Sequence, residues 1–206
     1  MAFGTHWEWR GFGSVSRELM ERLDSLPLLF PTSEDVTDRY LYVPGCLANI
    51  KVRFSDLKFK RLLETSGALE CWLEDPGENH RFPVGPAELD KLAKDLGVDI
   101  PRPAAGSLDL EGLLEVLQRS TPRVVVLSVH KVRWQHEWRE SPQADPVTVE
   151  LARILEPEET WSVGVEASRP EAVAQAVQSL SFSEGIRKRN YVEALEVWAR
   201  GESVGR

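Results

Sequence analysis

The sequence HWEWR at residues 6–10 places a polar or charged side chain at every second position, with tryptophan between them. The same alternation returns with mostly basic residues in NIKVR at 49–53, LKFK at 57–60 and KVRW at 131–134. Successive side chains of a β-strand point to opposite faces, so each stretch predicts a strand with one charged and one apolar face. Because lysine and arginine are gathered on particular strands of a chain whose net charge is −8, the pattern indicates a concave site for a polyanion.

The bulk composition is typical of a globular protein. The chain has 206 residues, of which 42% are hydrophobic and 28% charged, and this length is enough to bury a core without disulfides. The acidic balance argues against nonspecific DNA binding and membrane-surface binding, so neither partner is expected. The two cysteines, Cys46 and Cys71, have no cysteine or histidine at metal-ligand spacing, and the sequence shows no signal peptide or apolar span. We therefore expect a cytoplasmic protein.

Short strand patterns and helical patterns divide the whole chain. Eight stretches favour strands, at 5–11, 38–43, 48–54, 57–63, 68–75, 123–138, 147–155 and 160–167. Apolar spacing and capping residues predict helices at 14–26, 85–96, 107–119, 170–180 and about 185–199. An antiparallel sheet of this size with one polar face is best completed as a closed or nearly closed barrel whose polar face lines the lumen. The prediction is one α+β domain over residues 1–206, with a helical insertion at about 85–120 and flanking C-terminal helices at about 169–200.

The charged motifs follow one another in a definite order along nearly the whole chain. The order begins with His6-x-Glu8-x-Arg10 and Asp38-Arg39-Tyr40. The later motifs are Lys51-x-Arg53, Lys58-x-Lys60, Glu70-x-Trp72-x-Glu74, Lys131-x-Arg133, Glu150, Gly164-x-Glu166 and Arg189-Asn-Tyr191. This order resembles the CYTH superfamily, the triphosphate tunnel metalloenzymes, which open on Glu-x-Glu-x-Lys and close their barrel with Glu-x-Glu. Each motif alone is weak, and the order carries the resemblance.

The resemblance implies a site inside the barrel for a triphosphate-containing small molecule or a polyphosphate. The residues implied for phosphate binding are Arg10, Lys51, Arg53, Lys58, Lys60, Lys131 and Arg133. The residues implied as catalytic ligands of Mg²⁺ or Mn²⁺ are Glu8, Glu150 and Glu166, with His6, Glu70 and Glu74 as accessory candidates. The charges agree with this assignment, because several cations must neutralise a triphosphate and carboxylates must limit the repulsion among those cations.

Three positions depart from the family pattern near the implied metal site. His6 and Gly164 replace the first glutamates of the opening and closing motifs, and Ala152 takes an inward position on the strand of Glu150. Histidine is a poor ligand for Mg²⁺, although Mn²⁺ accepts it, and glycine offers no side-chain ligand. Phosphate binding is therefore better preserved in this sequence than metal-assisted hydrolysis.

Three functions stay open at this point. The first is a divalent-metal-dependent hydrolase acting on tripolyphosphate, a nucleoside triphosphate or thiamine triphosphate. The second is a catalytically weakened sensor module that binds a nucleotide or polyphosphate. The third is a non-catalytic protein-interaction scaffold, in which the basic strands are solvated sheet faces and the glutamates are ion-pair partners. The first ranks slightly ahead because three carboxylates can hold one metal ion when substrate oxygens complete its shell; cyclase chemistry and a homodimer also stay open.

Overall fold

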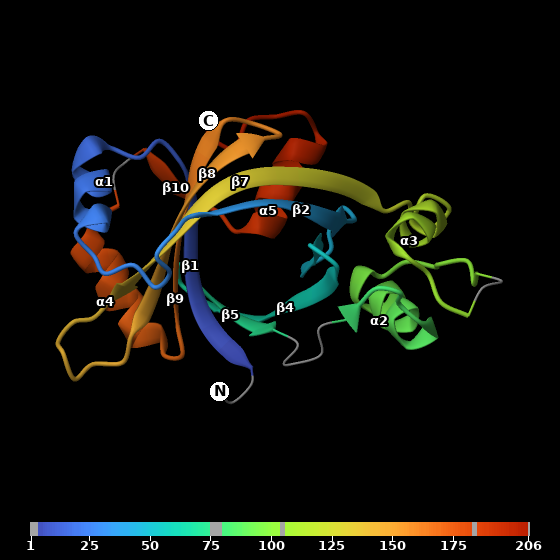
Figure 1. The fold of residues 1–206 in the computed structure, drawn as a ribbon, viewed down its shortest axis with the longest axis horizontal. Helices are drawn as coiled ribbons and strands as arrows, with labels where there is room; N and C mark the ends of the chain where they lie inside the picture. The colour runs from blue at the N-terminus through green and yellow to red at the C-terminus, as the bar shows by residue number, and fades with distance from the viewer. Residues whose placement is uncertain (1–3, 75–79, 104–105, 183–184, 206) are drawn as a thin grey trace.

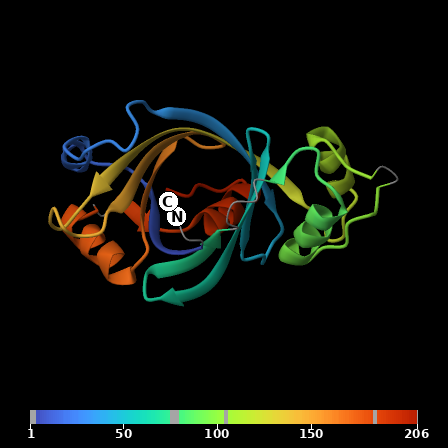
Figure 2. The same cartoon turned by 60° about the horizontal axis from the view of Figure 1, so that its bottom comes forward.

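Eight antiparallel strands form a closed ring in the computed structural model, which describes residues 4–74, 80–103, 106–182 and 185–205 (Figures 1 and 2). Around the ring the strands are β1 (Thr5–Gly13), β5 (Leu69–Glu74), β4 (Asp56–Ser66), β3 (Ala48–Arg53), β2 (Glu34–Tyr42), β7 (Val125–Trp138), β8 (Val147–Glu156) and β9 (Thr160–Ala167). The ring closes because β1 pairs with β9 as well as with β5. The predicted α+β fold with an eight-stranded antiparallel barrel is confirmed.

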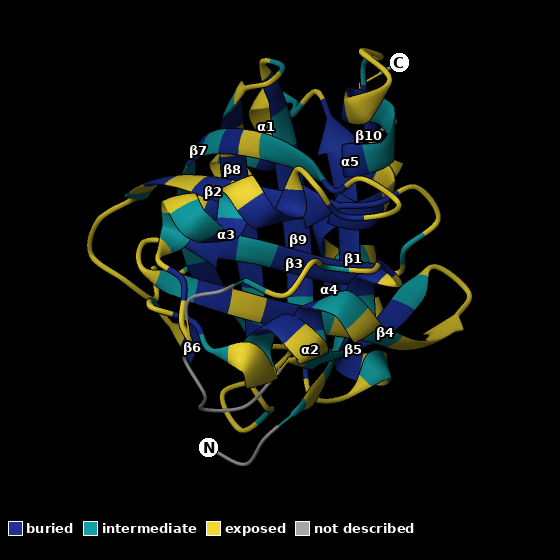
Figure 3. Ribbon diagram, turned by 90° about the vertical axis from the view of Figure 1, so that its right-hand side faces the viewer, coloured by how far each residue is buried: buried dark blue, intermediate teal, exposed yellow. Residues whose placement is uncertain are grey.

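Side chains of the barrel strands alternate between the lumen and the outer wall. On β3, Lys51 and Arg53 line a cavity in the lumen, whereas Ile50 and Val52 pack outside. The helices α2 (Pro86–Leu96) and α3 (Leu110–Leu117) cover the outer faces of β3 and β4, and α1 (Arg17–Asp24) and α4 (Pro170–Leu180) cover β1, β8 and β9. Much of the barrel wall is consequently buried, while the outward faces of the helices are exposed (Figure 3). None of the described helices is long and apolar enough to cross a membrane.

The helix α5 (Tyr191–Ala199) lies across one end of the barrel (Figure 2). Its buried face packs on aromatic residues from the strands: the Phe12 ring meets Tyr191 and Trp198 edge-on, at centroid distances of 5.2 and 5.7 Å, and the Tyr40 ring stacks on Tyr191 at 5.3 Å. Trp72 of β5 belongs to the same buried cluster. One half of the lumen is therefore filled by apolar and aromatic side chains, and α5 forms the floor of the charged half.

Two short strands and several helix boundaries differ from the sequence prediction. The predicted helix at 185–199 is wrong in its first part, because Ile186–Lys188 form β10 beside β1 and the helix begins only at Tyr191. Gly13 permits this approach: a Cβ added to it would lie 1.9 Å from the Gly185 carbonyl oxygen. The strand β6 (His80–Arg81), which pairs with β4, was also missed.

The other expected elements are present with shifted ends. The helix α3 starts at Leu110 rather than at residue 107, because the Asp109 side chain caps it by accepting a hydrogen bond from the Gly112 amide at 2.8 Å. The last residue of the strand predicted at 68–75 lies outside the described residues, as do residues 104–105 of the predicted insertion.

Candidate functional site

A cavity of about 380 Å³ lies in the charged half of the lumen. All seven predicted phosphate-binding residues line it: Arg10, Lys51, Arg53, Lys58, Lys60, Lys131 and Arg133. Four carboxylates line it as well, from Glu8, Glu74, Glu150 and Glu166. Seven cations therefore face four carboxylates at one cavity, and this excess of positive charge suits a multiply charged anion.

Asp38 anchors three of the cations from below the cavity. Its carboxylate is fully buried and accepts a bidentate pair from Arg53, Nε to Oδ1 at 2.6 Å and Nη2 to Oδ2 at 2.7 Å. The ammonium groups of Lys51 and Lys131 lie 3.3 and 3.4 Å from Oδ2. Burial alone would raise the pKa of Asp38, but the adjacent positive charges hold this pKa far below its usual range. The resulting cluster fixes three cations on β3 and β7.

Lys51 has an unusual pKa for a lysine. Burial lowers the pKa of Lys51 to about 7, and the positive charges of Arg53 and Lys131 add to this effect while Asp38 opposes it. An anion that entered the cavity would favour the charged form of Lys51 and raise its pKa again. Binding of an anion near pH 7 would therefore be coupled to proton uptake by Lys51.

Tyr191, the first residue of α5, forms part of the cavity floor. Lys131 Nζ donates to the Tyr191 hydroxyl at 2.9 Å and lies 4.5 Å from the centre of its ring. The Arg10 guanidinium lies 5.0 Å from the same ring centre. Asp38 and Tyr191 belong to two of the motifs that carry the family resemblance, but neither was predicted as a site residue. A local signal existed for Asp38, which lies two residues before Tyr40 on the same face of a predicted strand.

Arg10 lies among the three predicted metal ligands. Its Nε donates to Glu8 at 2.5 Å, Nη1 to Glu150 at 3.0 Å and Nη2 to Glu166 at 3.2 Å, and Nη1 also reaches the Ser162 hydroxyl at 3.1 Å. Burial alone would lower the pKa of Arg10, but the neighbouring carboxylates hold it well above its ordinary value. Burial would raise the pKa values of Glu8 and Glu150, but Lys60 and Arg10 hold the pKa of Glu8 below its ordinary value, and Arg10, Lys131 and Arg133 do the same for Glu150.

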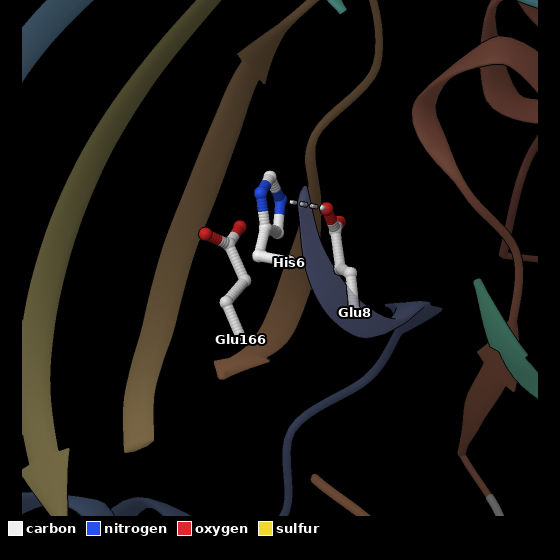
Figure 4. Close-up of side chains that lie close together, drawn as sticks. All are labelled: His6, Glu8 and Glu166. Atoms are coloured by element: carbon white, nitrogen blue, oxygen red, sulfur yellow. Dashed lines mark ion pairs between the residues drawn. The ribbon is translucent and has the colours of Figure 1, made fainter. Parts of the chain in front are cut away.

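His6, Glu8 and Glu166 form a possible metal-binding group at the edge of this cluster. One ligand atom from each residue lies within 4.8 Å of the others, and Figure 4 shows His6 between the two glutamates. The His6 Nε2 atom is buried without a hydrogen-bond partner and lies 3.8 Å from Glu8 Oε2. However, both oxygens of Glu8 are already bonded, one to Arg10 and the other to Lys60.

A divalent ion fits this arrangement poorly. It would lie beside Arg10 and Lys60, and it would compete with them for the oxygens of Glu8 and Glu166. Glu150 does not belong to the group with His6, and its two oxygens are bonded to Arg10 and to Arg133, the latter at 2.8 Å. The chain's own cations therefore already balance the carboxylates that a metal would need.

Three predicted residues have positions unlike the rest. Lys58 lines the exposed side of the cavity and forms no ion pair within the described part of the chain. Glu74 is also exposed at the cavity. Glu70 does not line the cavity: it is buried, accepts a hydrogen bond from Asn190 Nδ2 at 2.9 Å and pairs with Lys188. Its predicted accessory role at a metal is therefore not supported by its position.

Comparisons with known proteins give structural matches alone. No family model matches the chain, and no curated protein matches it. A conserved hypothetical protein from Pyrococcus furiosus and the PH1012 protein from Pyrococcus horikoshii are each 17% identical, with a TM-score of 0.47 over 90% of this chain and 98% of theirs. A protein from Bacillus halodurans described as "a putative adenylate cyclase" is 13% identical, with a TM-score of 0.45 over 93% of this chain and 98% of its own. The fold assignment rests on the strand pairing, which gives the closed barrel that the CYTH resemblance implied.

Proposed function

We propose that the chain binds a triphosphate or longer polyphosphate group in the basic cavity of the barrel. The observation that carries the proposal is the convergence of seven cations from β1, β3, β4 and β7 on one cavity, in a protein with a net charge of −8. A volume of about 380 Å³ is within the range of small-molecule sites. A solvated sheet face would not need a buried carboxylate such as Asp38 to hold its cations together.

The cations differ in how other groups of the chain hold their charge. Arg53, Lys51 and Lys131 are all held in place by Asp38, so they offer a rigid positive wall. Lys58 has no competing carboxylate among the described residues, and Lys51 gains charge when an anion arrives. These two lysines face each other across β3 and β4. They are therefore the residues that respond most directly to an incoming phosphate.

Isothermal titration calorimetry with tripolyphosphate and with orthophosphate tests the proposal. We expect tripolyphosphate to bind in the presence of EDTA. Orthophosphate should bind much more weakly, because it carries fewer negative charges and can contact fewer of the cations in the cavity. Lys58→Ala should weaken tripolyphosphate binding about tenfold, the value of one charge-assisted hydrogen bond. Lys94→Ala, which removes an exposed lysine on α2 away from the cavity, is the matched control. Equal affinities for Lys58→Ala and the wild type would refute the phosphate clamp.

Metal-assisted hydrolysis is the second candidate, and the group of His6, Glu8 and Glu166 is the observation that favours it. Phosphate release from a panel of triphosphates with Mn²⁺ or Mg²⁺ tests it. Turnover that is lost in Glu8→Gln would establish an enzyme, whereas binding without turnover would leave a sensor module. Absence of both binding and turnover would leave the scaffold function.

A further inference from the structure

The guanidinium of Arg10 occupies the centre of the carboxylate cluster. Its nitrogens donate to Glu8, Glu150 and Glu166, which belong to three adjacent strands, and the Arg10 side chain is only 4% exposed. The strand register explains the convergence: Arg10 pairs with Gly164 across β1 and β9, and Gly164 pairs with Glu150 across β9 and β8. Arg10, Gly164 and Glu150 therefore lie side by side on β1, β9 and β8.

Gly164 is the residue that makes room for Arg10. A Cβ added at position 164 would lie 2.5 Å from Arg10 Nη2 and 2.7 Å from Cζ. Any side chain at this position would therefore displace the guanidinium. Because residue 164 is glycine, β9 offers no side-chain metal ligand at this position, and the Arg10 guanidinium occupies the space that a side chain would fill.

We infer that Arg10 is a resident counter-cation, which neutralises the carboxylates in place of a divalent metal and leaves the cavity able to bind polyphosphate without one. Glu8 and Glu150 use their remaining oxygens to bind Lys60 and Arg133. Three carboxylates therefore already face three cations, of which Arg133 also pairs with Glu34. A divalent ion would bring two more positive charges directly beside Arg10 and Lys60, at a high electrostatic cost. The inference that polyphosphate binds without a metal rests on the proposed function, whereas the inference that Arg10 takes the place of a metal does not.

Direct Mn²⁺ binding, measured from the electron paramagnetic resonance signal of free Mn²⁺, tests the inference without any phosphate ligand. We expect weak binding by the wild type and at least about tenfold tighter binding by Arg10→Gln, because the carboxylates lose their central cation. Gly164→Ala should act in the same direction by displacing Arg10, and Gly106→Ala, at an open exposed position, should have no effect. A cooperative thermal unfolding transition will be required of each variant as evidence that it is folded.

Two results would overturn the inference. The first is Mn²⁺ binding by the wild type as tight as by folded Arg10→Gln. The second is tripolyphosphate binding that disappears in EDTA and returns with Mn²⁺, which would leave the proposed function intact. A different result would separate the two proposals. If the wild type binds no tripolyphosphate under any condition but Arg10→Gln gains a Mn²⁺ site, the role of Arg10 in place of a metal is supported and the proposed function is refuted.

Discussion

Asp38→Asn tests whether one buried carboxylate organises the basic cavity. The substitution keeps the shape of the side chain but removes the charge that holds Arg53, Lys51 and Lys131. Breaking a buried ion pair on one side typically costs about 3–5 kcal/mol, because the remaining charges stay buried and unpaired. In a chain of this length each kcal/mol corresponds to about 2–4 °C, so we expect the melting temperature to fall by about 6–20 °C.

The pH dependence of stability provides a second, signed test of the same residue. The pKa of Asp38 is depressed in the folded state, so its contribution is fully present above the unfolded value of about 3.9. The contribution is lost as the pH falls below that value. Urea unfolding between about pH 6 and pH 3 should therefore show a steeper loss of stability in the wild type than in Asp38→Asn.

Ligand binding should change in the opposite direction from stability. Removing one negative charge leaves the cavity more positive, so tripolyphosphate should raise the melting temperature of Asp38→Asn more than that of the wild type. Asp35→Asn is the matched control on β2, because Asp35 is exposed and its partner among residues that the structure describes is His130 at the surface. A melting temperature of Asp38→Asn equal to that of the wild type would refute the organising role of the carboxylate.

Three further predictions concern single residues around the cavity. Polyphosphate affinity should fall as the pH rises above about 7, where free Lys51 loses its proton; Lys51→Arg should lack this component in calorimetry across pH, and an identical pH profile would contradict the shifted pKa. Tyr191→Phe should destabilise the fold by about 1–3 kcal/mol in urea unfolding, because Lys131 loses a buried hydrogen-bond partner; an unchanged unfolding midpoint would show that the hydroxyl is dispensable. Gly13→Ala should detach β10 from β1, since its Cβ would collide with the Gly185 carbonyl, and fast hydrogen exchange at Ser14, whose amide donates to that carbonyl at 3.0 Å, would report this; unchanged protection would argue against the close approach.

The strand alternation predicted the lumen-facing cations because it depends only on local sequence. Lys51 and Arg53 on one strand and Lys131 and Arg133 on another point inward in any closed barrel that buries their apolar neighbours. The register between strands is not local, so the sequence could not show that Arg10 would reach Glu150 and Glu166 rather than a ligand. The residue was predicted as a phosphate ligand, and that role stays a prediction.

The floor of the cavity could not be predicted for a related reason. The position of Tyr191 depends on how α5 docks against strands far away in sequence, and no periodic pattern encodes that docking. Likewise, β10 has only three residues, too few for an alternation to be recognised, and it exists because glycines in β1 allow its approach. Asp38 carried a local signal, since it and Tyr40 lie on the same face of β2. Its contacts with three cations, however, depend on strands that are distant in sequence.

Calorimetric titration of the wild-type chain with tripolyphosphate in EDTA, repeated at increasing salt, tests the central claim most directly. We predict saturable binding to one site that weakens as ionic strength rises, because charge neutralisation in the cavity supplies the affinity. Heat changes indistinguishable from dilution at low salt, both in EDTA and with added Mn²⁺, in a protein shown to be folded, would contradict it.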